Sequence, residues 1–215
     1  MIRISHRTYL PGIWAGGTTK GIWAEPADAI SSPAAARWWV GTAVIERDAP
    51  YSFFAGRSRL HLPIHGDGLR LHFRNPSEEV VLARNTPYQF HGEWEVDATL
   101  VDGPVIAFNL IYRADGIAAA SVVTVGADEL VWPRPALEQG VVGTRELVQI
   151  VYSIAGAPTI SAGAEQAVTL ARDDTLVVPA HQHVDTMPQL FLMASDAAPA
   201  TVVLATLWLP TDITV

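Results

Sequence analysis

The sequence predicts an all-β protein built from short strands that are joined by tight turns. Apolar and polar residues alternate in runs such as Leu69–Arg74 and Trp94–Leu100, the pattern of a strand with one buried face. Such runs recur at roughly 8–12-residue spacing, with Gly, Pro, Asn or Asp between them. No segment keeps helical periodicity over several turns, so we expect a sandwich or barrel.

The composition describes a folded chain with few charges. The 215 residues are 49% hydrophobic and 17% charged, which excludes general disorder and suffices for one large core or two small ones. A net charge of −8 argues against nucleic acid as a partner, because phosphate binding needs a concentrated positive surface. The absence of cysteine excludes disulfides and thiolate chemistry.

Targeting signals are also missing from the pattern. No run is apolar enough for a membrane-spanning helix, and the N-terminus lacks the apolar core of a signal peptide. We therefore expect a cytoplasmic protein with no membrane partner.

The first thirty residues combine a short expected strand with the loop Trp14–Trp23. Gly16 and Gly17 permit unusual backbone conformations, and Thr18 and Thr19 add two hydroxyl groups beside them. Two interpretations stay open: a turn between strands, or a loop that covers a pocket and hydrogen-bonds a ligand. A phosphate-binding loop is excluded, because the spacing lacks GxxxxGK[ST] and no helix follows.

The rest of the chain continues this series of strands. After Ser32 a short helical turn is expected, with Pro33 in its first position, and a strand follows from Trp39. Further strands are expected throughout 52–113, and then within 120–132, 145–156, 166–183, 188–195 and 200–210.

An internal repeat divides the chain into two expected domains, 1–116 and 117–215. Three segments recur in the same order at offsets of 90, 88 and 95 residues: Leu60–Gly66 with Ile150–Gly156, Leu82–Asn85 with Leu170–Asp173, and Pro104–Ala107 with Pro199–Val202. Three matches at nearly one offset indicate two copies of one β unit.

A set of ordered motifs carries a family resemblance. The motifs are WAGGTT at Trp14–Thr19, FAGRSR at Phe54–Arg59, GDGL at Gly66–Leu69, PYQFHG at Pro87–Gly92 and FNLIYR at Phe108–Arg113. This series resembles the HutD/Ves family of bicupins, which occurs in bacteria and is often associated with histidine utilisation. In the second half, Thr169–Pro179 looks like the second conserved motif of cupins.

The resemblance covers about residues 8–210 and implies a bicupin, with two RmlC-like jelly-roll barrels packed as one compact unit. The sequence departs from the family at three places. Lys20 with Gly21, Ser58 and Ala107 stand where the family usually has acidic residues.

The strongest candidates for ligand binding are two arginines that end motifs. A barrel mouth lined by the guanidinium groups of Arg59 and Arg113 would bind a carboxylate through paired hydrogen bonds. In the alternative interpretation these arginines form structural ion pairs with acidic residues, namely Glu46, Asp48 or Asp102. The predicted ligand-binding residues are Trp14, Thr18, Thr19, Arg59, Asn109 and Arg113, where the threonines close over the ligand and Asn109 orients it.

Metal and nucleophilic catalysis have little support. His61 and His65 are expected on one strand face and His181 and His183 on another, but no Glu follows His183 where a cupin metal site needs one. No G-x-S-x-G elbow is present. We therefore predict no metal, no cofactor and no assigned catalytic residue.

Three functional hypotheses follow. In the first, the first barrel binds a small carboxylate metabolite without catalysis, and the resemblance implies a link to histidine breakdown. In the second, the protein is a cupin-type isomerase, lyase or hydrolase with His61, His65 or His91 as general base. In the third it is an oligomerising structural module, and a homodimer is left open.

Overall fold

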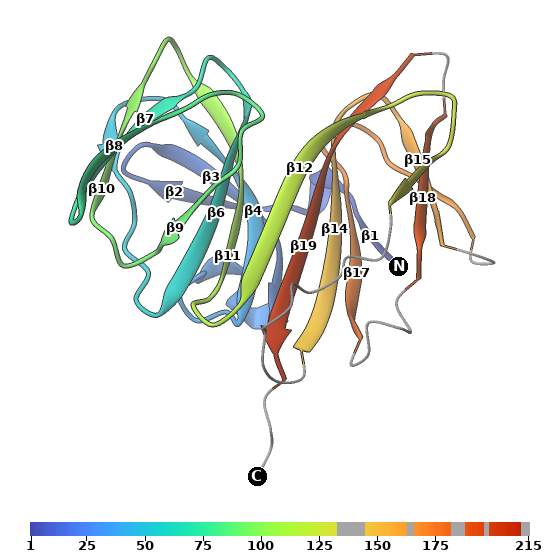
Figure 1. Ribbon diagram of the computed structural model, residues 1–215, viewed down its shortest axis with the longest axis horizontal. Helices are drawn as coiled ribbons and strands as arrows, with labels where there is room; N and C mark the ends of the chain where they lie inside the picture. Colours follow the sequence, from blue (N-terminus) through green and yellow to red (C-terminus); the bar gives the residue numbers. More distant parts are fainter. Residues whose placement is uncertain (133–144, 163–165, 182–187, 196–197, 212–215) are drawn as a thin grey trace. The chain divides into compact units, whose positions relative to one another are not determined.

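The protein is almost entirely β-sheet in the computed structural model, which describes residues 1–132, 145–162, 166–181, 188–195 and 198–211. Within these residues, nineteen strands form four antiparallel sheets, and the only helices are the 3-10 turns η1 (His6–Thr8) and η2 (Ala27–Ser31) (Figure 1). The predicted all-β class is confirmed. No helix in this described part is long and apolar enough to cross a membrane.

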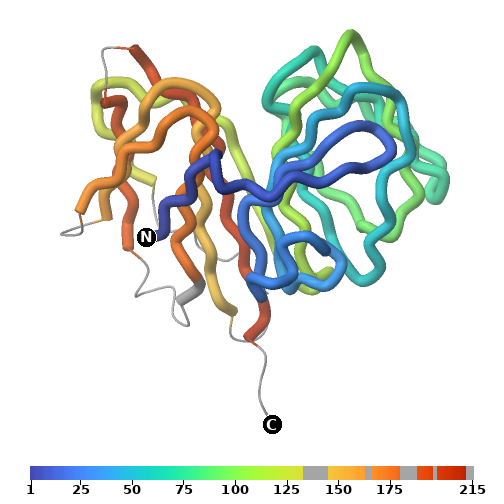
Figure 2. Tube along the Cα trace, turned by 180° about the vertical axis from the view of Figure 1, so that it is seen from behind, coloured from blue at the N-terminus to red at the C-terminus, as the bar shows by residue number. Residues whose placement is uncertain are grey.

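The chain divides into two compact units, Thr8–Ala114 and Met1–Arg7 with Asp115–Val215. The first seven residues therefore do not belong to the N-terminal barrel that we expected at 1–116. The physical reason is strand pairing: β1 (Ile2–Ile4) pairs with β17 (Thr175–His181), and Figure 2 shows the dark blue start of the chain beside this orange strand.

The first unit consists of a six-stranded and a four-stranded sheet. The six-stranded sheet has the order β2 (Leu10–Trp14), β3 (Gly17–Glu25), β4 (Trp38–Ile45), β11 (Val105–Arg113), β6 (Arg57–His65), β9 (Tyr88–His91). The four-stranded sheet has the order β5 (Ala49–Pro50), β10 (Val96–Leu100), β7 (Leu69–Arg74), β8 (Ser77–Leu82). Leu69, Leu71 and Phe73 of β7 are buried, as the alternation predicts, and form one core with residues of β4, β10 and β11.

The second unit has the same kind of construction. One sheet has the order β1, β17, β14 (Arg145–Ala155), β19 (Ala200–Pro210), β12 (Ile117–Val125). The other has the order β13 (Leu130–Trp132), β18 (Leu190–Ala194), β15 (Pro158–Ala162), β16 (Val168–Thr169). Buried residues of both sheets form its core, among them Leu147, Val151, Leu192 and Leu204.

Strand pairing supports the internal repeat. The pairs β4–β11, β11–β6 and β6–β9 of the first unit correspond in order to β12–β19, β19–β14 and β14–β17 of the second. The backbone repeats at the same offsets. Asn85 and Asp173 have positive φ angles of 64° and 67°, and Gly66 and Gly156 have φ angles of 88° and 76°. After Ser32, as expected, the chain forms a short turn, in which the N–H groups of Ala35 and Ala36 donate to the carbonyls of Ser32 and Pro33, and the 3-10 turn η2 precedes it.

Asp174 ties the N-terminal segment to the second unit. Its side chain, 1% exposed, accepts hydrogen bonds from Arg3 (Nη2, 2.6 Å) and from both the backbone N–H (3.0 Å) and the Nδ1 of His6 (3.0 Å). The backbone N–H of Ala171 donates to it as well. Burial raises the pKa of Asp174, but these hydrogen bonds outweigh burial and lower the pKa to about 2.

Replacing Asp174 with Asn should lower the free energy of unfolding at pH 7 by about 1–3 kcal/mol, because a buried acceptor of several donors is lost. A depressed pKa contributes stability that is complete above about pH 4 and disappears as the pH falls toward 2. Urea unfolding at pH 7, 4 and 3 should therefore show that the difference in free energy of unfolding between wild type and Asp174→Asn becomes smaller as the pH falls. A gap that does not depend on pH would contradict this account.

Candidate functional site

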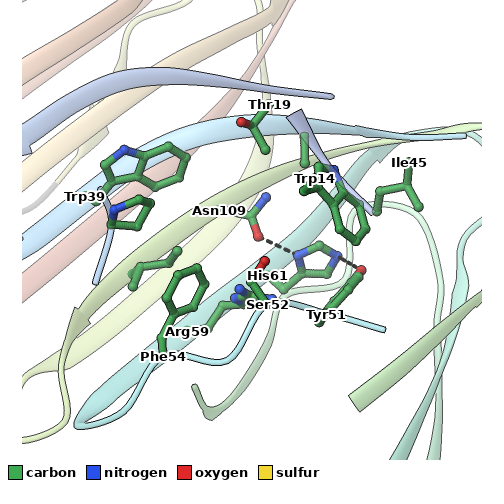
Figure 3. Close-up of a pocket in the computed structure, with 13 residues that line it drawn as sticks. Trp14, Thr19, Trp39, Ile45, Tyr51, Ser52, Phe54, Arg59, His61 and Asn109 are labelled. Carbon is green, nitrogen blue, oxygen red and sulfur yellow. Dashed lines mark hydrogen bonds between the residues drawn. The ribbon is translucent and has the colours of Figure 1, made fainter. Parts of the chain in front are cut away.

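A cavity lies inside the first unit and opens to solvent. It has about 500 Å³ of empty space, with its mouth included, so the part that side chains enclose is smaller and suits a small ligand. Strands β2, β3, β4, β6 and β11 and the segment 51–54 supply its walls (Figure 3). The lining residues are Trp14, Thr19, Pro33, Trp39, Ala43, Ile45, Tyr51, Ser52, Phe54, Arg59, His61, Asn109 and Ile111.

Arg59 provides the positive charge of this cavity. Its side chain comes from β6 and is 7% exposed. The guanidinium carbon lies 5.1 Å from the ring centre of Tyr51, 4.9 Å from that of Phe54 and 5.5 Å from that of Phe90. Three aromatic rings thus hold the cation in place.

No carboxylate among the described residues forms an ion pair with Arg59, and its Nε is buried without a hydrogen-bond partner. The alternative interpretation, an ion pair with Glu46, Asp48 or Asp102, does not hold for this residue in the structure. Burial lowers the pKa of Arg59 to about 10, although the neighbouring Tyr51 acts in the opposite direction. The group remains charged at neutral pH, and its positive charge is uncompensated.

Next to Arg59, three polar side chains form a hydrogen-bonded chain (Figure 3). His61 is 1% exposed; its Nδ1 lies 2.7 Å from Asn109 Oδ1, and its Nε2 lies 3.1 Å from the hydroxyl of Tyr51. Asn109 Nδ2 donates to the carbonyl of Ala107. The amide oxygen of Asn109 must therefore accept from His61 Nδ1–H, which leaves Nε2 to accept from the Tyr51 hydroxyl.

This arrangement keeps His61 neutral. Burial lowers the pKa of His61 to about 4; the hydrogen bond to Asn109 raises it and the charge of Arg59 lowers it further. Burial likewise raises the pKa of the Tyr51 phenol well above its ordinary value, so both groups are uncharged beside the arginine.

Four of the six predicted ligand-binding residues line the cavity: Trp14, Thr19, Arg59 and Asn109. Thr18 is exposed and pairs with Val44. Because neighbouring residues of a strand face opposite sides of the sheet, its side chain points away from the cavity that Thr19 lines. Arg113 is the last residue of β11, two positions beyond Ile111, and does not line the cavity. Asn109 lines the cavity and its Oδ1 lies 2.7 Å from His61 Nδ1.

The sequence did not single out two other parts of the site. Tyr51 lies in a segment that pattern analysis leaves unassigned, and only the fold brings it against His61 and Arg59. Trp39 is buried and lines the cavity, and its indole Nε1 donates to the carbonyl of Ile30 at 2.8 Å. In the sequence, the one feature that pointed to Tyr51 and Trp39 was the density of aromatic residues between Trp38 and Phe54.

His61 and His65 do not share a site. A bulge in β6 shifts the register, so His61 pairs with Asn109 whereas His65 pairs with Ile106 on the opposite face. Our expectation that these two histidines share a face is therefore wrong. No group of three or more His, Asp or Glu side chains suited to a metal exists in the described part of the chain, and His183 lies outside it.

The environment of His61 predicts its titration. Its Cε1–H resonance in an NMR pH series should stay constant from pH 8 to about 5.5 and move only near pH 4, with a His61→Gln variant to assign the signal. Since the unfolded chain takes up this proton near pH 6.5, acidification from about 6.5 toward 4 should also weaken folding. A midpoint near 6.5 in the folded protein would contradict the buried hydrogen-bonded chain.

Solved structures place this fold among known ones. A conserved protein of unknown function from Pseudomonas aeruginosa PAO1 superposes with a TM-score of 0.76 at 24% identity, covering 96% of this chain and 97% of the other. HutD from Pseudomonas fluorescens SBW25 gives a TM-score of 0.66 at 22% identity, covering 95% and 97%. Oxalate decarboxylase from Bacillus subtilis gives 0.63 at 7% identity, covering 95% and 76%. At these identities the likeness concerns the fold.

Sequence comparison adds the family. An uncharacterised protein from Pseudomonas putida, encoded in the 3′ region of hutC, is 29% identical over 112 residues, which is 52% of this chain and 57% of that protein. This match therefore spans little more than half of the relative. The HutD family model matches residues 7–193, most of the chain. The chain belongs to the HutD family.

Proposed function

We propose that this protein binds a small carboxylate in the cavity of its first unit and does not transform it. The observation that carries the proposal is the guanidinium of Arg59, buried in that cavity without a carboxylate partner in the part of the chain that the structure describes. Burying a charge is costly unless a partner of opposite sign is close. A ligand carboxylate can accept two parallel hydrogen bonds from guanidinium and so supply the missing charge.

The neighbouring groups favour binding over catalysis. Both ring nitrogens of His61 are used in hydrogen bonds, and its low pKa makes it a weak base. His65 faces the other side of β6, and His91 is exposed on β9. The three histidines that we considered as general bases therefore do not converge on the cavity.

The family suggests where such binding would be used. The Pseudomonas putida relative is encoded beside hutC, and the family carries the HutD name. Histidine breakdown proceeds through small carboxylates, so we propose that this protein senses or sequesters one of them. The HutD structure from Pseudomonas fluorescens was determined in a formate condition, which makes formate a useful probe.

Formate and acetate should each raise the melting temperature of the wild-type protein. Saturation at about 100 times the dissociation constant adds about 2.7 kcal/mol to the free energy of unfolding, which is readily measured. Arg59→Met keeps the volume of the side chain and removes its charge, so it should abolish the shift.

Arg113→Met is the matched control, because it removes the same charge from a residue that does not line the cavity. It should keep the carboxylate shift. If Arg59→Met binds acetate as tightly as wild type in isothermal titration calorimetry, the cavity is not the binding site and the proposal fails.

A further inference from the structure

The charge content of the cavity narrows the ligand class. Among the described residues that line it, Arg59 is the only charged side chain, and no Lys, Asp or Glu joins it there. The other polar groups are neutral: His61 has a pKa near 4, and its hydrogen bonds to Tyr51 and Asn109 occupy both ring nitrogens. The cavity therefore neutralises one negative charge.

The remaining walls are mostly apolar, although Thr19 and Ser52 also line the cavity and the indole Nε1 of Trp14 is buried without a hydrogen-bond partner among the described residues. Pro33, Trp39, Ala43, Ile45 and Ile111 surround the polar groups, with Trp14 and Phe54 adding aromatic rings. Trp39, Ala43, Ile45 and Ile111 are all buried, so they present little surface to solvent. A second carboxylate placed against these walls would lose its hydration and gain no cation.

From this we infer that the ligand is a monocarboxylic acid with an apolar body. Its carboxylate lies on Arg59, and its carbon chain lies against Ile45, Ile111 and the indole rings. The inference rests on the proposed function and makes it more specific. An arginine alone is compatible with both monocarboxylates and short dicarboxylates, and the inference excludes the dicarboxylates.

The structure also identifies the competing possibility. Arg57 and Arg113 stand opposite each other on β6 and β11, two residues beyond the pair of Arg59 and Ile111. Neither lines the cavity, and Arg57 Nη2 donates to the carbonyl of Ala34 at 2.9 Å. A dicarboxylate would have to extend beyond the cavity and displace such contacts to use these arginines.

The test uses isothermal titration calorimetry to compare acids of increasing length, acetate, propionate and butyrate, with succinate as the four-carbon dicarboxylate and butyramide as the uncharged analogue of butyrate. Each added methylene that reaches the walls should tighten binding about fourfold. Succinate should bind at least about tenfold more weakly than butyrate, because its second carboxylate loses water without gaining a cation. Butyramide should not bind, because it cannot form the charged contact with Arg59.

Two variants separate the parts of the cavity. Ala43→Leu adds volume to the apolar wall, so it should remove the gain from acetate to butyrate and weaken butyrate binding more than formate binding. Circular dichroism would verify that this variant is folded. Arg57→Met should change none of the affinities.

The outcomes are distinguishable. Succinate that binds as tightly as butyrate, and loses this affinity in Arg57→Met, would overturn the monocarboxylate inference while the carboxylate-binding function survives. Equal affinities for acetate and butyrate would also overturn it. If none of the acids binds, the proposed function itself fails and the inference fails with it.

Discussion

The feature on which the site depends is a guanidinium group buried among aromatic rings without a carboxylate beside it. Tyr51, Phe54 and Phe90 hold the head of Arg59, and the strand β6 fixes its stem. Ring quadrupoles compensate a cation only in part. Because Arg59 remains charged at neutral pH, the cavity keeps a positive potential that favours anions. The neutral chain of Tyr51, His61 and Asn109 gives this cation polar neighbours that do not cancel it.

The two units carry different residues at equivalent places of the repeat. At the repeat offset, Gln149 occupies the place of Arg59 and faces Thr206 as Arg59 faces Ile111. The hydrogen-bonded pair of His61 and Asn109 corresponds to Val151 and Leu204, which both belong to the core of the second unit. The same strand pairing therefore carries Arg59 and the His61–Asn109 pair in the first unit, and at the equivalent places of the second unit the buried polar pair of Gln149 and Thr206 beside the apolar pair of Val151 and Leu204.

Much of the fold could be predicted because the residue patterns of strands and turns are visible in short stretches of sequence. The alternation in β7 and the turn residues Gly66 and Asn85 each lie within a short segment. The two turn positions recur 90 and 88 residues later, at Gly156 and Asp173. Arg59, Asn109, Trp14 and Thr19 were found because they stand in recognisable motifs. The sequence did not predict that Arg113 lies beyond the cavity or that His65 lies on the other face of β6. The first depends on where the cavity ends along β11, and the second on a one-residue bulge in β6.

The sequence alone determined the fold class, the repeat and the presence of an arginine motif, because periodicity and turn chemistry act between neighbouring residues. It could not determine which arginine is buried, or that Tyr51 meets His61, because these facts depend on contacts between strands far apart in the chain. Nor could it place the first seven residues with the second unit, where Asp174 accepts hydrogen bonds from Arg3 and His6. Burial and charge compensation are properties of the packed interior, so only the tertiary structure decided the chemistry of the cavity.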